Sequence, residues 1–171
     1  MTRSDETTTG LSALVSGLRI GQGFDVHPWS TDPDRVLVLG GVSFPNSPGL
    51  AGHSDADAIA HAATDAILGA AGLGDIGSLF PDTDAAFAGA NSIELLGIAT
   101  QRLADHGWQV VNIDCTVICD APKLAPVRDQ IIANMSGAVG APVSVKGKRT
   151  EGVEGLAGGV QCHAVALVVK Q

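Results

Sequence analysis

The 171-residue sequence contains no tyrosine, and aromatic residues make up only 4% of it. Charged residues are also scarce at 16%, and the net charge is −8. Proteins that bind the phosphate backbone of nucleic acids are normally basic, and proteins that bind single strands use aromatic side chains as stacking platforms. The composition therefore argues against a nucleic-acid partner.

Long apolar runs are missing as well, and none reaches the ~18 residues that a membrane span requires. The first 17 residues are polar and acidic at Asp5 and Glu6, whereas a targeting peptide is basic near its start. We predict that residues 1–17 are a disordered extension and that residues 18–171 form one domain. No membrane partner is expected.

Cysteine is rare, and the three present are Cys115, Cys119 and Cys162. An odd count without a signal peptide indicates reduced thiols and a cytoplasmic protein. There is no C-x-x-C motif, so buried small apolar side chains are favoured over a structural zinc site.

Small and apolar residues are abundant, with 22 glycines and 45% hydrophobic residues. This composition favours close packing or burial between subunits. Apolar spacing predicts helices over 54–71, 92–106 and 126–140, and strands over 18–27, 35–44 (bent at Gly40–Gly41), 108–119, 142–146 and 160–170. Loops are expected over 45–52, 75–90 and 147–159. We expect an α/β (α+β) two-layer sandwich, in which a mixed four-stranded sheet carries helices on one face in a ferredoxin-like arrangement.

Two strand residues form the first candidate metal arm. Asp25 and His27 are two apart, so their side chains point to the same side of a strand. A carboxylate and an imidazole on one face are suitable zinc ligands. Taken alone, the pair is better explained as a chance Asp and His at an exposed strand end.

The helix predicted over 54–71 strengthens the metal hypothesis. Asp57, His61 and Asp65 are four apart and share one helix face. His61 can offer one nitrogen to a metal while a neighbouring carboxylate, Asp57 or Asp65, takes the proton on the other. The alternative is a polar stripe toward solvent, but alanines surround His61. His53 and Ser54 are expected at the helix start, where free N–H groups favour an anion.

Two further clusters suggest phosphate chemistry. The segment 75–84 holds three carboxylates, and Lys146, Lys148 and Arg149 lie close to Glu151 in the sequence. Basic side chains bind phosphate, and a carboxylate beside phosphates suggests a second divalent ion such as Mg²⁺. Each cluster is also consistent with solvated surface charge. The sequence has no P-loop, no complete G-x-G-x-x-G, no H-E-x-x-H and no G-x-S-x-G.

Three segments together resemble a known family. They are RIGQGFDVHPW at 19–29, AGHSDADAIAHAATDAILGAAGLGDIGSLFPDTD at 51–84 and APKL at 121–124. These segments are similar to those of the 2-C-methyl-D-erythritol 2,4-cyclodiphosphate synthases, and the resemblance runs from residue 18 to the end of the chain. It implies a lyase of the non-mevalonate route of isoprene biosynthesis.

The resemblance implies roles for residues by motif match. Asp25, His27 and His61 would hold one Zn²⁺ per subunit, Glu151 would hold a second ion, Mg²⁺ or Mn²⁺, and His53 would be catalytic. The residues expected to contact substrate are Asp25, His27, His53, Ser54, Asp75, Ile76, Gly77, Phe80, Pro81, Asp82, Thr83, Asp84, Cys119, Pro122, Lys123, Leu124, Ala125, Lys148, Thr150 and Glu151.

The implied reaction converts 4-diphosphocytidyl-2-C-methyl-D-erythritol 2-phosphate into 2-C-methyl-D-erythritol 2,4-cyclodiphosphate and CMP. It needs no protein nucleophile, so catalysis depends on positioning and charge neutralisation. The resemblance also implies a homotrimer with active sites between subunits.

The chain departs from the family pattern in the loop after residue 147. Arg149 stands where a catalytic Thr is usual, and an Arg that usually follows the Glu is missing. We expect Arg149 to act in catalysis in its place. Two hypotheses outside the family remain open: a zinc-dependent phosphoesterase that releases phosphate, and a metal-binding trimer without catalytic activity.

Overall fold

A computed structural model describes residues 15–171 of the chain. Residues 1–14, which are most of the segment predicted to be disordered, lie outside the described residues. At the end of that segment, the Gly17 carbonyl accepts a hydrogen bond from the Lys170 amide. The main sheet has the strand order β1-β6-β4-β5. Strands β4 and β5 are parallel, and the other pairs are antiparallel. The bounds are β1 Leu18–Pro28, β4 Trp108–Ile118, β5 Val143–Lys148 and β6 Gly159–Lys170.

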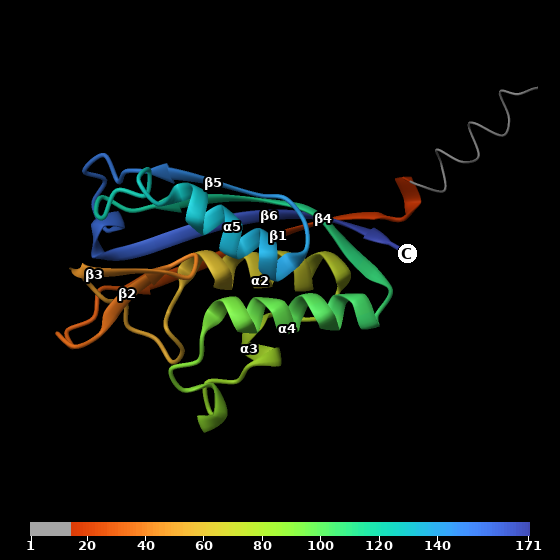
Figure 1. The fold of residues 1–171 in the computed structure, drawn as a ribbon, viewed down its shortest axis with the longest axis horizontal. Helices are drawn as coiled ribbons and strands as arrows, with labels where there is room; N and C mark the ends of the chain where they lie inside the picture. The colour runs from red at the N-terminus through yellow and green to blue at the C-terminus, as the bar shows by residue number, and fades with distance from the viewer. Residues whose placement is uncertain (1–14) are drawn as a thin grey trace, which may run out of the picture.

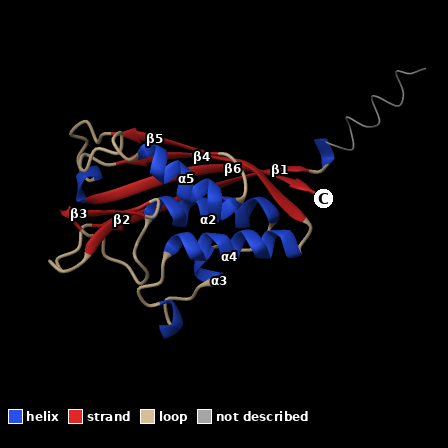
Figure 2. Ribbon diagram, viewed as in Figure 1, coloured by secondary structure: helices blue, strands red, loops and turns tan. Residues whose placement is uncertain are grey.

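Three longer helices cover one side of this sheet (Figures 1 and 2). They are α2 (Ala58–Ala71), α4 (Ser92–Asp105) and α5 (Arg128–Val139). The predicted loops contain the short helix α3 (Ile76–Leu79) and the 3-10 turns η1 (Ala85–Phe87) and η2 (Leu156–Gly158). The predicted α+β class, with helices on a mixed four-stranded sheet, is confirmed. No helix within residues 15–171 is long and apolar enough to cross a membrane.

The ferredoxin-like topology is wrong for this chain. That arrangement follows the order β-α-β-β-α-β. Here the main-sheet strands and long helices follow the order β-α-α-β-α-β-β. The physical reason lies in β4, α5 and β5, where the helix links two neighbouring parallel strands and leaves no gap for another strand between them.

The predicted single bent strand over 35–44 is a hairpin. Its strands are β2 (Val36–Leu39) and β3 (Val42–Pro48), which form a separate two-stranded sheet. Gly40 and Gly41 have φ of 57° and 72°, the conformation that two-residue hairpin turns require and that glycine adopts easily. The turn becomes important below because its two amides hold a buried carboxylate.

Helix α2 packs directly on β1 because two glycines remove the side chains between them. A Cβ atom on Gly23 would lie 1.9 Å from the Ala62 carbonyl oxygen, and one on Gly21 would lie 2.0 Å from the Ala66 oxygen. The facing side of α2 is rich in buried alanine, so helix and strand approach closely. This contact brings His61 to the strand residues that follow Gly23.

We expect Gly23→Ala to destabilise the protein by about 1–3 kcal/mol or more, because the added methyl group meets rigid backbone. The displacement of α2 from β1 should also weaken metal binding. Gly69→Ala on the same helix is the matched control. A Cβ at Gly69 meets nothing within 4 Å, so this change should be neutral or stabilise by about 0.5–1 kcal/mol. Thermal unfolding of both variants measures the difference; equal melting temperatures would contradict this packing.

Candidate metal centre and adjoining hollows

Strand β1 and helix α2 bring three potential metal ligands together. Asp25 and His27 lie on the side of β1 that carries Gly21 and Gly23, which is the side covered by α2. His61 lies on the first turns of α2 and is 9% exposed. The predicted grouping of Asp25, His27 and His61 is therefore present, and it is the only such ligand group among the described residues.

The ligand atoms form a small triangle. His27 Nε2 lies 3.0 Å from Asp25 Oδ2 and 3.1 Å from His61 Nδ1. Asp25 Oδ2 and His61 Nδ1 are 3.2 Å apart. Ligands of a tetrahedral zinc, each about 2.0 Å from the ion, are about 3.3 Å from one another. Asp25 Oδ2 is buried and lacks a well-formed hydrogen bond. Spacing, chemistry and the unsatisfied oxygen all fit a cation bound by these three atoms.

The other ring nitrogens are held by the surrounding protein. His27 Nδ1 lies 2.8 Å from the Ala51 carbonyl oxygen, which can only accept, so this nitrogen carries the proton. His61 Nε2 lies 2.9 Å from Ser92 Oγ and 3.0 Å from Ser54 Oγ. When each ring is neutral and carries its proton on these outer nitrogens, the lone pairs of His27 Nε2 and His61 Nδ1 are available to a cation beside Asp25.

The cluster is electrostatically prepared for a cation. Burial alone would raise the pKa of Asp25, but the neighbouring imidazoles of His27 and His61 hold it far below its usual range. Burial disfavours the charged form of His27, yet the Asp25 carboxylate outweighs this effect and raises the pKa of His27. Without metal, a proton on His27 neutralises Asp25; a bound cation replaces that proton.

The predicted roles of Asp57 and Asp65 beside His61 are wrong. Helix α2 begins later than predicted, and Asp57 is its N-cap. The buried Asp57 carboxylate accepts hydrogen bonds from the amides of Gly40 and Gly41 as well as from the first helical turn. Asp65 accepts a hydrogen bond from the Ile76 amide at 2.7 Å. Neither carboxylate hydrogen-bonds His61, because hairpin and loop amides occupy them.

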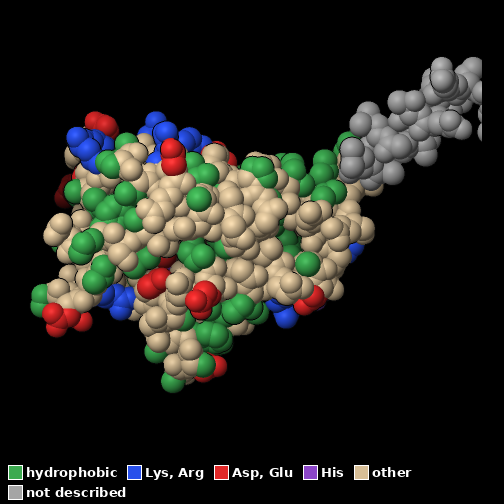
Figure 3. Space-filling model, viewed as in Figure 1, with side chains coloured by type: hydrophobic (Ala, Val, Ile, Leu, Met, Phe, Trp, Pro, Cys, Tyr) green, Lys and Arg blue, Asp and Glu red, His purple; other side chains and the backbone are tan. Residues whose placement is uncertain are grey.

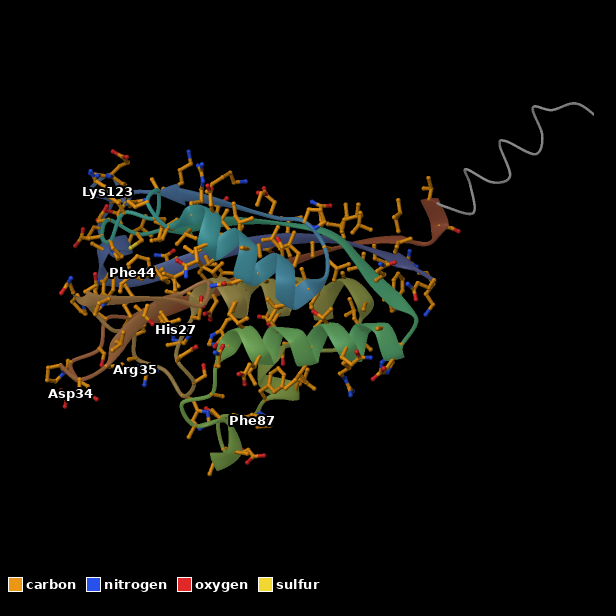
Figure 4. All side chains as sticks on the ribbon, viewed as in Figure 1. His27, Asp34, Arg35, Phe44, Phe87 and Lys123 are labelled. Atoms are coloured by element: carbon orange, nitrogen blue, oxygen red, sulfur yellow. The ribbon has the colours of Figure 1, made fainter. Side chains whose placement is uncertain are left out.

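The first of two hollows, which we call the metal hollow, opens beside this cluster and has a volume of about 430 Å³. His53 and Ser54 line it as predicted, but they precede the helix N-terminus, whose amides are already capped by Asp57. Figure 4 shows His27 on the side of the sheet that faces the segment carrying Phe87. The lining residues are Asp25, His27, His53, Ser54, His61, Ile76, Gly77, Phe80, Pro81, Asp82, Phe87 and Leu95.

Within the segment 75–84, three of the residues predicted to contact substrate do not line the metal hollow. Asp75 caps α3 through the Ser78 amide at 2.7 Å, and Asp84 caps η1 through the Ala86 amide at 2.9 Å. Thr83 is exposed in the intervening turn. The carboxylates of Asp75 and Asp84 thus support local backbone, while Ile76, Gly77 and Asp82 face the hollow.

The second hollow, which we call the basic hollow, lies at the end of β5 and has a volume of about 340 Å³. Figure 3 shows Lys and Arg side chains gathered along this edge, and Figure 4 shows Lys123 well apart from His27. The two hollows share no lining residue. The basic hollow is lined by Val117, Cys119, Asp120, Pro122, Lys123, Leu124, Ala125, Arg128, Val145, Gly147, Lys148 and Arg149.

Two predicted phosphate-side residues line neither hollow. Thr150 is buried, and its hydroxyl donates to Asp120 Oδ2 at 2.6 Å while its amide donates to Oδ1 at 3.0 Å. Glu151 is exposed and has a φ of 52°. The Asp120–Thr150 pair therefore anchors the loop at the point where Glu151 turns outward.

All three cysteines lie in the interior of the protein. Cys115, Cys119 and Cys162 are buried and unpaired, which confirms their prediction as small core side chains. Burial raises the pKa of Cys119 to about 11, so its reactive thiolate is scarce at neutral pH.

Sequence reasoning missed several contributors to the site. Phe87 and Leu95 supply apolar lining to the metal hollow, and the Ala51 carbonyl orients His27. Asp55 and Ser92 form the hydrogen-bonded support behind His61. The sequence Asp55-Ala56-Asp57 contains two carboxylates, but only contacts between distant segments show that Asp55 is the one that supports the site.

Fold and site together define an α+β protein with a three-ligand group that could hold a metal ion. Residues 18–169 match the YgbB family, and the chain belongs to that family. Proteins named 2-C-methyl-D-erythritol 2,4-cyclodiphosphate synthase are similar to it throughout. The one from Aromatoleum aromaticum is 52% identical over 162 residues, 92% of this chain and 97% of that protein. The one from an Azoarcus species is 50% identical over 157 residues, 89% and 96% of the two chains.

A solved structure agrees with this placement. The CDP complex of IspF from Plasmodium falciparum aligns with a TM-score of 0.76 and 37% identity, over 91% of this chain and 97% of that one. The resemblance drawn from residues 19–29, 51–84 and 121–124 is confirmed, and so is the class of enzyme that it implied.

Proposed function

We propose that the chain converts 4-diphosphocytidyl-2-C-methyl-D-erythritol 2-phosphate into 2-C-methyl-D-erythritol 2,4-cyclodiphosphate and CMP, as a step of isoprene biosynthesis. Membership of the synthase family supports this reaction. The observation that carries it at the site is the convergence of Asp25, His27 and His61 beside an open hollow. Such an arrangement binds an ion and leaves room for a phosphate oxygen.

Zn²⁺ is the proposed ion, one per subunit, because two imidazole nitrogens and one carboxylate oxygen suit it. When bound, it supplies Lewis acidity at the β-phosphate. The 2-phosphate oxygen of the substrate attacks the β-phosphorus, and the bond to the CMP phosphate breaks. No protein nucleophile takes part, in agreement with the burial of all three cysteines.

The remaining residues position the substrate. In this proposal Ile76, Gly77 and Phe80–Asp82 hold the methylerythritol part, with Asp75, Thr83 and Asp84 shaping that loop. His53 and Ser54 face the phosphates, and His53 stabilises the charge of the transition state. Cytidine binds in the basic hollow, along Cys119 and the segment from Pro122 to Ala125. The CDP complex of the Plasmodium falciparum relative supports a nucleotide ligand of this kind.

Arg149 and Lys148 are proposed to face the departing phosphate from the basic hollow, which both residues line. A guanidinium group matches phosphate oxygens in two-point contacts and remains charged at neutral pH. Arg149 is therefore suited to neutralise charge on the CMP leaving group. Thr150 contributes through the position of the loop rather than through a free hydroxyl, because its hydroxyl donates to Asp120.

A homotrimer is proposed in which the metal hollow of one subunit faces the basic hollow of the next. The absence of any shared lining residue supports a site completed by a neighbour. The side of β1 away from α2 exposes Ile20, Phe24 and Val26 by 74%, 45% and 49%. An apolar face of this kind is suited to contact a second copy. We place the enzyme in the cytoplasm, where unpaired thiols are stable.

Glu151 is proposed to hold a second ion, Mg²⁺ or Mn²⁺, only when substrate phosphates complete its coordination. Glu151→Gln should raise the Mg²⁺ concentration needed for half-maximal activity by roughly tenfold, because one carboxylate ligand is lost, and leave zinc content unchanged. Activity titrations with Mg²⁺ and elemental analysis measure the two effects. Glu154→Gln, three residues along the same exposed loop, is the control. Loss of zinc in Glu151→Gln, or the same Mg²⁺ shift in Glu154→Gln, would contradict the assignment.

Product analysis tests the proposed reaction. The protein is incubated with the cytidylyl substrate, Zn²⁺ and Mg²⁺, and products are identified by phosphorus NMR and mass spectrometry. We expect equal amounts of CMP and cyclic diphosphate. Release of inorganic phosphate would instead indicate a phosphoesterase, and an unchanged substrate would indicate a metal-binding protein without this activity.

A further inference from the structure

His61 has a hydrogen-bonded support on the side away from the ligand triangle. Its Nε2 lies 2.9 Å from Ser92 Oγ, and both groups are buried: His61 is 9% exposed and Ser92 is 1% exposed. Ser92 is the first residue of α4, and His61 is on α2. The contact therefore ties the two helices together at the metal centre.

Asp55 determines the direction of this hydrogen bond. Its Oδ2 accepts from the Ser92 amide at 3.0 Å, and its Oδ1 accepts the Ser92 hydroxyl proton in a short hydrogen bond. A serine hydroxyl has one proton. Because Asp55 takes that proton, Ser92 Oγ can only accept from His61 Nε2–H. The lone pair of His61 must then reside on Nδ1, which faces Asp25 and His27.

Ser54 does not compete for this role. Its Oγ lies 3.0 Å from His61 Nε2, but no carboxylate holds its hydroxyl, and its other contacts are the Ala56 amide and Ser92 Oγ, each at 3.3 Å. Asp55 is also fixed by its backbone, since its amide donates to the Ala90 carbonyl oxygen at 3.1 Å. The backbone amides of both Asp55 and Ser92 are thus hydrogen-bonded, although the two residues are 37 positions apart in the sequence.

We propose that Asp55 and Ser92 are positioning residues that hold His61 in the tautomer and orientation needed to bind the metal through Nδ1. This inference rests on the metal centre of the proposed function. It assigns the supporting role to Asp55, which was expected of Asp57 or Asp65. Partners of this kind typically contribute 10–100-fold to metal affinity.

Asp55→Asn is the sharpest variant because it keeps the shape of the side chain. An amide at this position can donate to Ser92 Oγ, which frees the serine proton to point at His61 Nε2. That reversal moves the His61 proton to Nδ1, where it blocks the metal. We expect Zn²⁺ affinity, measured by competition with a chelator on the full-length chain, to fall roughly 10–100-fold. The Zn²⁺ affinity of Ser92→Ala should fall by a similar factor, whereas Ser92→Thr, which keeps the hydroxyl, should retain most of the wild-type affinity.

Asp105→Asn is the matched control, since it removes the same charge at the opposite, exposed end of α4, where the carboxylate accepts a hydrogen bond from Gln101 Nε2 and does not contact His61 or Ser92. Its zinc affinity should equal that of wild type. The double variant Asp55→Asn/Ser92→Ala should bind zinc no more weakly than the weaker single variant, because the two residues act as one unit. Additive losses of zinc affinity in the double variant would overturn the proposal. Zinc affinities within about threefold of wild type for both single variants would also overturn it, because such partners usually have a much larger effect.

Nitrogen NMR of the His61 ring gives a readout that a merely structural role would not change. In the wild-type protein we expect the proton on Nε2, and in Asp55→Asn a shift toward the Nδ1–H form. A wild-type Nδ1–H tautomer would refute the proposal even if the variants fail to fold. Since these measurements use zinc and the chain alone, they succeed or fail independently of cyclodiphosphate formation.

Discussion

Replacing His61 with alanine should remove the bound metal and lower turnover by at least about 10³-fold. A metal ion contributes several kcal/mol to stabilising transition-state charge, and each 1.36 kcal/mol corresponds to about a factor of ten in rate. His61 is one of only three ligands, and Asp25 and His27 alone form an incomplete site. Elemental analysis of the purified variant measures metal content, and the release of CMP measures turnover.

His106→Ala is the control for this change. His106 is exposed at the end of α4, and its Nδ1 contacts only the Arg102 carbonyl oxygen among the contacts described. It should retain full zinc and full activity. A His61→Ala protein that keeps one zinc per subunit would show that the ligand assignment is wrong. One that loses zinc but keeps its activity would show that the reaction does not depend on this metal.

Two inactive variants should restore activity when they assemble into one trimer. His61→Ala damages the metal hollow, and Gly147→Trp fills the basic hollow, where a Cβ at Gly147 would contact the Leu124 side chain at 3.8 Å. Each variant alone has three defective sites. If every site combines the metal hollow of one subunit with the basic hollow of the next, any mixed trimer contains one intact site.

Co-expression of the two variants with different affinity tags isolates the mixed trimers. We expect them to show about one third of wild-type activity per trimer, since one of the three symmetric sites is complete. Each parent trimer, purified in the same way, should be nearly inactive. Light scattering should give three times the mass of the chain. Mixed assemblies no more active than their parents, or a monomeric protein at micromolar concentration, would contradict shared sites.

Local patterns in the sequence, together with the family resemblance, identified the three candidate metal ligands. The spacing of two between Asp25 and His27 places both on one strand face, and the alanine-rich helix explains how His61 reaches them. Both relations depend on strand and helix periodicity, which the sequence displays directly. The role of Gly21 and Gly23 is visible only in the structure, where a strand without side chains at these positions lets the helix approach closely.

Contacts between distant segments could not be predicted in the same way. Asp57 was expected beside His61, yet its carboxylate accepts hydrogen bonds from the amides of Gly40 and Gly41 in the hairpin turn. The partner that does support His61 is Ser92, which is 31 residues away in the sequence. No periodicity relates such positions, since their contact depends on how the loops before α2 and α4 pack against each other.

Crystals of the zinc-loaded protein, measured at wavelengths on either side of the zinc absorption edge, test the central claim most directly. The account predicts one strong anomalous peak per subunit, bonded to Asp25 Oδ2, His27 Nε2 and His61 Nδ1 at about 2.0–2.2 Å. The remaining coordination position should open into the metal hollow. A peak located elsewhere, or zinc bound through His61 Nε2, would contradict the account.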